Sequence, residues 1–162
     1  MLTIDQAWCA LQQVTDPELP ALSICELGIV RDVQSTADQV TVVVTPTYSG
    51  CPATEVIQSA IREALTSAGA AKVTIQTRLS PAWTTDWITP TAREKLRDHG
   101  IAPPGVREAA GTQPVRFLPP APECPRCRSR STVRISEFGA TACKALYRCE
   151  SCAEPFEYVK PL

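Results

Sequence analysis

Two closely spaced pairs of cysteines constrain the fold of this chain more than any other feature. They are Cys124-Pro125-Arg126-Cys127 and Cys149-Glu150-Ser151-Cys152. A gap of two residues lets one tight turn present both thiolates to a single ion, and two such turns complete a tetrahedron. The residues 132–138, 144–149 and 155–160 alternate like strands that would hold the turns together. The pattern predicts a zinc ribbon over residues 123–162, with Cys124, Cys127, Cys149 and Cys152 as the zinc ligands.

The metal is predicted from the size of this module and from its ligands. About 40 residues bury too little surface to stay folded unaided, so metal binding would supply folding energy. Iron, alone or in a cluster, is an alternative because soft thiolates suit it, and disulfides are another. A fifth cysteine, Cys143, precedes the second pair. It is interpreted either as a small buried strand residue or as an auxiliary ligand.

The first hundred residues alternate between helical and strand-like patterns. Thr3 and Gln6 have the spacing of a capping box at the start of a helix. Strand patterns over 29–34 and 40–45 form a hairpin, a helix follows over 53–68, and a third strand covers 73–79. A short polar helix begins at Thr89-Pro90 and ends at Gly100. This order predicts an α+β fold, a small mixed sheet with helices on one face, over residues 1–100.

Residues 101–122 are rich in proline and lack periodicity, which predicts a semi-rigid linker before the zinc ribbon. The N-terminus lacks the basic flank and apolar run of a signal peptide, and no apolar stretch approaches a membrane span. With eight cysteines in such a chain, reduced thiols and a cytoplasmic location without membrane association are expected.

Cys51 and an acidic turn are the candidate functional residues of the first domain. Cys51 precedes a helix, where unpaired N–H groups and the helix dipole favour a thiolate that reacts or captures metal. The alternative is a packed cysteine that caps the helix. Asp16 and Glu18 flank Pro17 in a stiff turn, where they either help to bind a cation or satisfy the N–H groups of the turn. His99, the one histidine, is expected in solvent.

No pattern in the chain predicts catalysis or nucleic-acid binding. Nucleotide-binding loops and a catalytic Ser–His–Asp set are absent from the sequence. An arginine cluster lies beside the first cysteine pair, and its members are Arg126, Arg128, Arg130 and Arg134. No aromatic stripe accompanies it and the net charge is −1. The cluster is therefore interpreted as a solvated face, with nucleic acid as the weaker alternative.

The first domain resembles the iron–sulfur cluster assembly family that includes SufT. The resemblance rests on Asp16-Pro17-Glu18, on residues 26–33 (ELGIVRDV) and on residues 45–52 (TPTYSGCP). Cys51 matches the cysteine of that family. The resemblance implies that Cys51 transfers iron or a cluster, held transiently, with Asp16 and Glu18 beside it.

The rest of the chain resembles the PaaD family, the D subunits of bacterial phenylacetyl-CoA epoxidases. The matching stretches are residues 101–104 (IAPP), 136–139 (SEFG), 143–149 (CKALYRC) and 154–156 (EPF). This implies an accessory role in aerobic phenylacetate catabolism, in which the chain matures or maintains a metal centre of the oxygenase. The epoxidase components, especially the iron–sulfur reductase, are the implied partners. An integral structural or electron-transfer subunit is the alternative, and a homodimer remains open.

Overall fold

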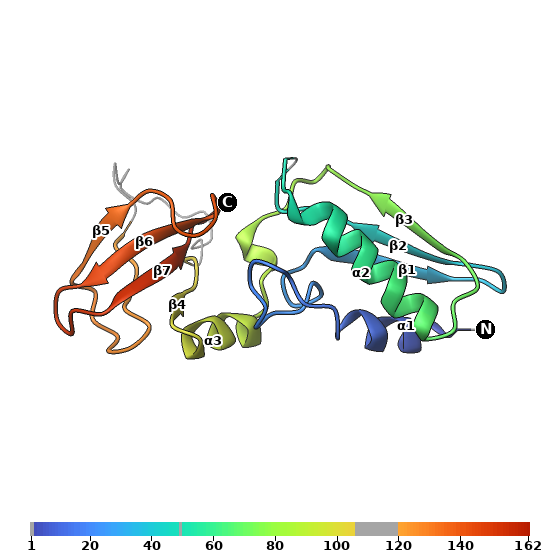
Figure 1. Cartoon of the computed structure of the whole chain (residues 1–162), viewed down its shortest axis with the longest axis horizontal. Helices are drawn as coiled ribbons and strands as arrows, with labels where there is room; N and C mark the ends of the chain where they lie inside the picture. The colour runs from blue at the N-terminus through green and yellow to red at the C-terminus, as the bar shows by residue number, and fades with distance from the viewer. Residues whose placement is uncertain (1, 49, 106–119) are drawn as a thin grey trace, which may run out of the picture. The chain divides into compact units, whose positions relative to one another are not determined.

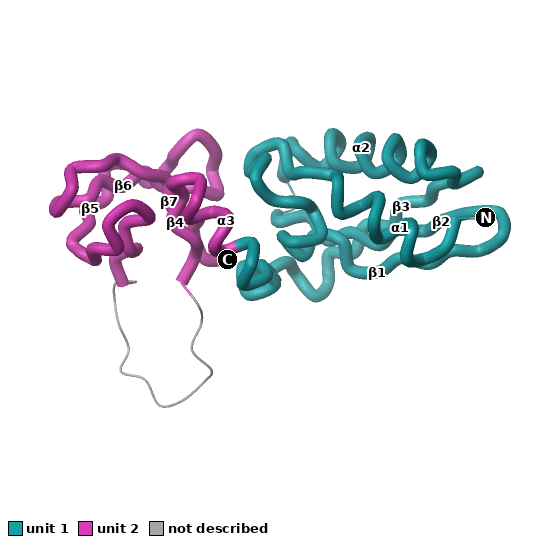
Figure 2. Tube along the Cα trace, turned by 90° about the horizontal axis from the view of Figure 1, so that it is seen from below, with its two compact units in different colours: residues 1–92 teal, residues 93–162 magenta. Residues whose placement is uncertain are grey.

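The computed structural model describes residues 2–48, 50–105 and 120–162. The chain divides into two compact units, Met1–Ala92 and Arg93–Leu162 (Figure 2). Within the described residues, none of the helices has both the length and the apolar character needed to cross a membrane.

The first unit is a three-stranded mixed sheet with two helices on one face (Figure 1). Strands β1 (Val30–Ser35) and β2 (Val40–Val44) form the predicted antiparallel hairpin, and β3 (Val73–Thr77) runs parallel to β2. Helices α1 (Ile4–Leu11) and α2 (Ala53–Ser67) cover the sheet. Every residue of β2 is buried, which makes this central strand the middle of the core. The predicted α+β class is confirmed.

The helix ends follow from local chemistry. Thr3 caps α1, with its hydroxyl accepting from the Gln6 N–H and the Gln6 side chain accepting from the Thr3 N–H, as the capping box predicts. Helix α1 ends at Leu11, where the N–H groups of Gln13 and Val14 donate to carbonyls three residues back, those of Ala10 and Leu11.

Two tryptophans after β3 pack on the loop that precedes β1. The Trp83 indole donates a hydrogen bond to the Leu27 carbonyl, 2.9 Å away. The Arg31 guanidinium lies 3.6 Å from the centroid of the Trp87 ring. Gly28 has φ of 72°, and a Cβ there would lie 2.7 Å from the Trp87 Cβ. Only glycine satisfies both the backbone angle and the close approach.

The second unit contains a four-stranded sheet in the order β4-β7-β6-β5. Strands β5 (Thr132–Ser136), β6 (Lys144–Cys149) and β7 (Pro155–Val159) are antiparallel neighbours, as predicted for the ribbon. One face of this sheet packs into a small core of Ala102, Cys124, Cys149, Phe156 and Tyr158. Half-buried Tyr147 stacks on Phe156, with ring centroids 6.0 Å apart.

Part of the predicted linker belongs to the ribbon sheet. Ile101 and Ala102 form β4, which pairs in parallel with Glu157 and Tyr158 of β7. The division between the units falls inside helix α3 (Pro90–Asp98), ahead of the predicted limit at residue 100. Most of the linker, residues 106–119, lies outside the described residues, so its stiffness stays a prediction.

Candidate metal centre

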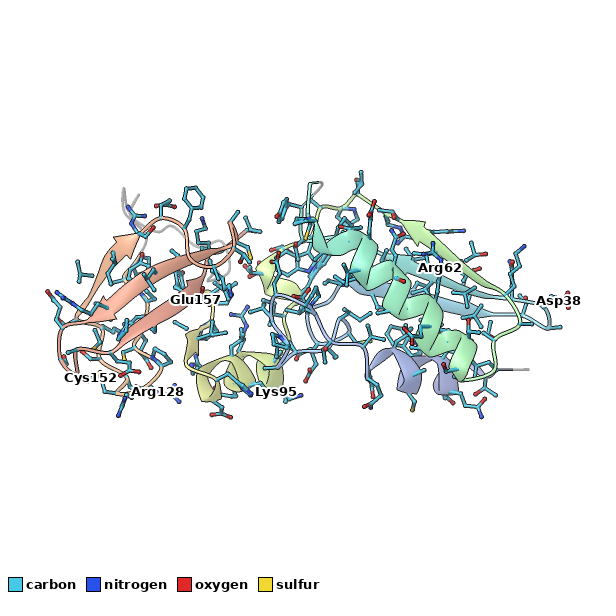
Figure 3. All side chains as sticks on the ribbon, viewed as in Figure 1. Asp38, Arg62, Lys95, Arg128, Cys152 and Glu157 are labelled. Atoms are coloured by element: carbon cyan, nitrogen blue, oxygen red, sulfur yellow. The ribbon has the colours of Figure 1, made fainter. Side chains whose placement is uncertain are left out.

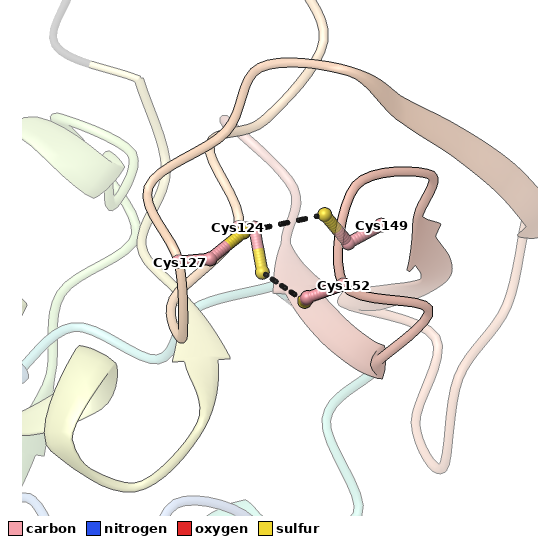
Figure 4. Close-up of side chains that lie close together, drawn as sticks. All are labelled: Cys124, Cys127, Cys149 and Cys152. Carbon is pink, nitrogen blue, oxygen red and sulfur yellow. Dashed lines mark hydrogen bonds between the residues drawn. The ribbon is translucent and has the colours of Figure 1, made fainter.

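Four cysteine sulfurs converge at one end of the ribbon sheet (Figure 4). The Sγ atoms of Cys124, Cys127, Cys149 and Cys152 all lie within 4.8 Å of one another. The Sγ of Cys124 is 3.8 Å from that of Cys152, and the Sγ of Cys127 is 3.5 Å from that of Cys149. A tetrahedral zinc with Zn–S bonds of about 2.3 Å requires sulfurs about 3.8 Å apart. The four sulfurs therefore fit a zinc site.

The two Cys-x2-Cys turns share one backbone design. Arg128 and Ala153, which follow the second cysteine of each turn, have φ of 64° and 63°. This left-handed conformation costs a non-glycine residue about 1–2 kcal/mol. It directs the chain back so that the Cys124 N–H donates to the Ser129 carbonyl, at 2.9 Å. The Cys149 N–H donates to the Glu154 carbonyl in the same way, also at 2.9 Å.

Backbone N–H groups in both turns point at sulfur. The Ser129 N–H donates to the sulfur of Cys127, and the Glu154 N–H donates to that of Cys152. In each turn the donor is thus two residues after the second cysteine. Such donors stabilise negative charge on sulfur and fix the direction of its lone pairs. Arg128 and Cys152 lie together at this end of the ribbon (Figure 3).

Three of the four thiols have shifted pKa values. The backbone N–H groups of Cys152 and Ser151 and the neighbouring thiols lower the pKa of Cys149 to about 6, although burial opposes them. For Cys127, the Ser129 N–H acts to lower the pKa, but hydrogen bonds to the other thiols and desolvation raise it to about 12. The pKa of Cys152 is also raised. Because like charges repel, holding four such close sulfurs as thiolates requires a cation among them.

Cys143 lies at the other end of β6 from this site. Cys149 is six residue steps along the strand from Cys143, which corresponds to about 20 Å at 3.3 Å per residue. The Cys143 sulfur lies 3.1 Å from the Thr141 hydroxyl, and its side chain is half-buried. The structure does not bring Cys143 to the four sulfurs, because an extended strand cannot fold back. We therefore do not propose it as an auxiliary ligand.

Cys51 occupies the loop that leads into α2. It stands one position ahead of Pro52, the N-cap of the helix. The Cys51 carbonyl accepts from the Thr54 N–H, and its own N–H donates to the Tyr48 carbonyl, both at 3.2 Å. Pro52 makes no side-chain hydrogen bond to the helix end. The Cys51 side chain is half-buried.

A buried hydroxyl at the start of the same loop was not predicted from the sequence. The Thr45 side chain is fully buried, and its Oγ1 has no hydrogen-bond partner among the described residues. An unsatisfied buried hydroxyl is costly and is found more often near functional sites. Thr45 lies in the stretch that resembles the assembly family, which is the one signal that points to it.

Asp16 has the geometry of a turn residue. Its Oδ1 accepts hydrogen bonds from the N–H groups of Glu18 and Leu19, at 2.8 and 2.9 Å. Among the described residues, the four ribbon cysteines are the one set of three or more acidic, Cys or His side chains close enough to share an ion. Cys51, Asp16 and Glu18 do not form such a set, so their part in metal transfer stays a prediction.

Carboxylates lie close to every member of the arginine cluster. Arg126 pairs with Glu154 at 2.7 Å and Arg134 with Glu137 at 2.5 Å. Arg128 and Arg130 both approach Glu123, within 3.6 and 3.9 Å. His99 is exposed, with Nδ1 2.8 Å from the Lys95 carbonyl. These contacts describe a solvated, charge-balanced face.

Known proteins match both units. The model of an iron–sulfur cluster assembly protein matches residues 4–77, and the PaaD zinc beta ribbon domain matches residues 110–160. The domain of unknown function DUF59 from Bacillus anthracis has a similar structure, with 25% identity, a TM-score of 0.54, and coverage of 57% of this chain and 89% of that one. A conserved hypothetical protein from Thermotoga maritima gives 33% identity, a TM-score of 0.51, and coverage of 58% and 93%.

A relative from Escherichia coli K12 matches nearly the whole chain. It is 54% identical over 157 residues, which cover 97% of this chain and 92% of the relative. It is named as the D subunit of a "Putative 1,2-phenylacetyl-CoA epoxidase". The four sulfurs, the ribbon around them and the assembly-type first unit all agree with the resemblance drawn from the sequence. The chain belongs to the family of phenylacetyl-CoA epoxidase D subunits.

Proposed function

We propose that this chain is an accessory protein of a phenylacetyl-CoA epoxidase system that matures or maintains an iron–sulfur or other metal centre of the oxygenase. The observation that carries the proposal is the position of Cys51. It lies inside the match to iron–sulfur cluster assembly proteins and just ahead of helix α2, whose N-cap residue Pro52 offers no side-chain cap. A half-buried cysteine there is a soft ligand that can hold iron and release it.

The two units have different tasks in this proposal. Cys51 holds the transferred iron or cluster, which is cargo, and Asp16 and Glu18 contribute carboxylates that favour a transient cation. The four ribbon cysteines hold a resident zinc. Because zinc does not change its oxidation state, it serves the fold of the ribbon and not electron transfer. The iron–sulfur reductase is the proposed client, since it is the component that must receive a cluster.

The test is to express the epoxidase components together with the wild-type chain or with Cys51→Ser, and to measure the iron content of the purified reductase. Serine keeps the volume of cysteine but removes a soft ligand, so the variant should fold normally and leave the reductase poor in iron. Asp16→Asn should cause a smaller loss. Cys9→Ser is the matched control, because Cys9 is an exposed cysteine on α1, away from the loop. Full iron content with Cys51→Ser would contradict the proposal.

A second candidate is an integral structural or electron-transfer subunit, which the word "subunit" in the name of the relative favours. The two functions differ in when the chain is needed. A maturation factor is dispensable once the reductase carries its full iron content. An integral subunit stays bound in fixed stoichiometry, and turnover stops when it is removed from the iron-loaded complex.

A further inference from the structure

Exposed apolar side chains gather at the outer strand of the ribbon sheet. Val133 and Ile135 of β5 are 40% and 54% exposed, and Phe138 in the following turn is 61% exposed. Within the described residues, β5 pairs with β6 alone, so its other edge offers backbone N–H and C=O groups. Isolated exposed apolar residues are common, but three within six positions beside an open strand edge form a surface.

The register of the sheet places Val133 on the face opposite the cysteine-containing core. Val133 lies opposite Arg148, and Ser136 lies opposite Leu146 after a bulge at Ile135. The alternate residues of β6, among them Tyr147 and Cys149, point to the other face and its core. Val133, Ser136, Leu146 and Arg148 therefore share the face opposite the cysteine-containing core, and exposed Ile135 lies at the bulge between Val133 and Ser136.

Arg148 differs from the arginine cluster. It is exposed, and no carboxylate pairs with it among the residues that the structure describes. Its nearest cross-strand neighbour on β7 is Pro155, which carries no charge. The apolar row is thus bordered by a positive charge that is free to meet a carboxylate from outside the chain.

Phe138 is held in its exposed position by its neighbours. The Lys160 ammonium lies 4.5 Å from the centroid of the Phe138 ring and donates to the Glu137 carbonyl at 3.1 Å. The same turn is also fixed to β7, because the Ala140 N–H donates a hydrogen bond to the Glu157 carboxylate at 2.8 Å. A fixed aromatic side chain loses little entropy when a partner covers it.

We propose that the β5 surface, defined as Val133, Ile135, Phe138 and Arg148, binds an extended segment of a partner protein that carries apolar residues and a carboxylate at every second position, so that they share one face of the added strand. The segment would add as a strand to β5, with its apolar side chains on Val133 and Ile135 and a carboxylate on Arg148. A second copy of β5 fits less well. Full antiparallel pairing of Thr132–Ser136 with itself would place Arg134 opposite Arg134, and like charges in that position repel.

The experiment uses the full-length chain and two fluorescent peptides in which threonine fills every second position. The remaining positions hold two valines followed by glutamate in one peptide, and two valines followed by lysine in the other, so that these side chains share one face of the strand. Fluorescence anisotropy should show about five-fold tighter binding of the glutamate peptide, because an exposed ion pair contributes up to about 1 kcal/mol. Arg148→Glu should reverse this preference, a gain that misfolding cannot imitate. Ile135→Lys should abolish binding. Val56→Lys is the matched control, since Val56 is equally exposed on α2 in the other unit.

Equal affinity for both peptides, or unchanged preference in Arg148→Glu, would overturn the proposal. So would a concentration-dependent dimer that Ile135→Lys abolishes, because it would identify a second copy as the occupant. Peptide binding and the iron content of the reductase are separate measurements, so this proposal and the proposed function can fail independently.

Discussion

The buried ion pair between Lys144 and Glu157 should be the most sensitive polar contact of the ribbon. The Lys144 side chain is 5% exposed, and its Nζ lies 2.8 Å from Oε2 of Glu157, which is 25% exposed. The other carboxylate oxygen accepts the Ala140 N–H at 2.8 Å. Glu157→Gln keeps the shape of the side chain but leaves the Lys144 ammonium buried without a counter-charge.

The expected decrease in the free energy of unfolding of the ribbon follows from this burial. Breaking a buried pair costs about 3–5 kcal/mol, and partial access of water to Glu157 reduces the expected loss to about 2–3 kcal/mol. Lys144→Met added to Glu157→Gln should recover most of this loss, since no charge then remains buried. Glu137→Gln, which removes an exposed pair with Arg134, is the matched control and should cost less than about 1 kcal/mol.

The assay follows each unit separately in one guanidinium titration. Cobalt in the four-sulfur site absorbs visible light and reports the ribbon. All three tryptophans, Trp8, Trp83 and Trp87, belong to the first unit and report it by fluorescence. Glu157→Gln should lower only the cobalt midpoint. If Glu157→Gln lowers the free energy of unfolding of the ribbon by less than about 0.5 kcal/mol, as ordinary surface substitutions do, the reasoning is refuted.

The pH dependence has a definite sign. Burial alone would raise the pKa of Glu157, but the hydrogen bonds from Lys144 and Ala140 and the charge of Lys144 lower it below its ordinary value of 4.5. A carboxylate whose pKa is lower in the folded than in the unfolded chain stabilises the folded state fully at pH values above its unfolded pKa. This stabilisation is lost as the pH falls through the folded pKa. The difference between wild type and Glu157→Gln should therefore be constant above about pH 5 and shrink below about 4.5.

Three further outcomes are expected. A chelator should unfold the ribbon and leave tryptophan fluorescence unchanged, because structural zinc contributes about 10–16 kcal/mol, and an ordered metal-free ribbon would contradict this. Gly28→Ala should destabilise the first unit by about 2–5 kcal/mol in a thermal melt, since it combines an unfavourable φ with a clash on Trp87. Gly69→Ala is the control: its φ is 104° but the space around it is open, so it should cost about 1–2 kcal/mol in the same melt. Alanine substitution of Arg126, Arg128 and Arg130 should leave the chain without measurable affinity for DNA in a low-salt titration, as in the wild type, and a salt-sensitive wild-type affinity would contradict the solvated-face interpretation.

The sequence predicted the features whose causes are local. The capping box at Thr3, the hairpin and the Cys-x2-Cys turns depend on residues only a few positions apart, so their spacing identifies them. Strand β4 was missed because Ile101 and Ala102 are followed by two prolines and pair with β7, far along the chain. No local pattern records such a parallel contact.

In the candidate site, too, the features with local causes were predicted and those that depend on the whole fold were not. The convergence of four sulfurs followed from spacing alone, whereas the distance of Cys143 from them depends on the direction of a whole strand. The orphaned hydroxyl of Thr45 depends on burial, which only the folded chain defines. Asp16 serves the turn by accepting two N–H groups, as one of its two interpretations held.

The position of β4 also affects the order of events during synthesis. The first unit can fold while the ribosome is still adding the second, since domains generally fold as units from the N-terminus. Ile101 cannot pair until Glu157 has emerged, so the sheet closes only after both cysteine pairs have been translated. At about 5–20 residues per second, the early thiols wait a few seconds for their partners. Metal capture would then be a late step, governed by translation as well as by affinity.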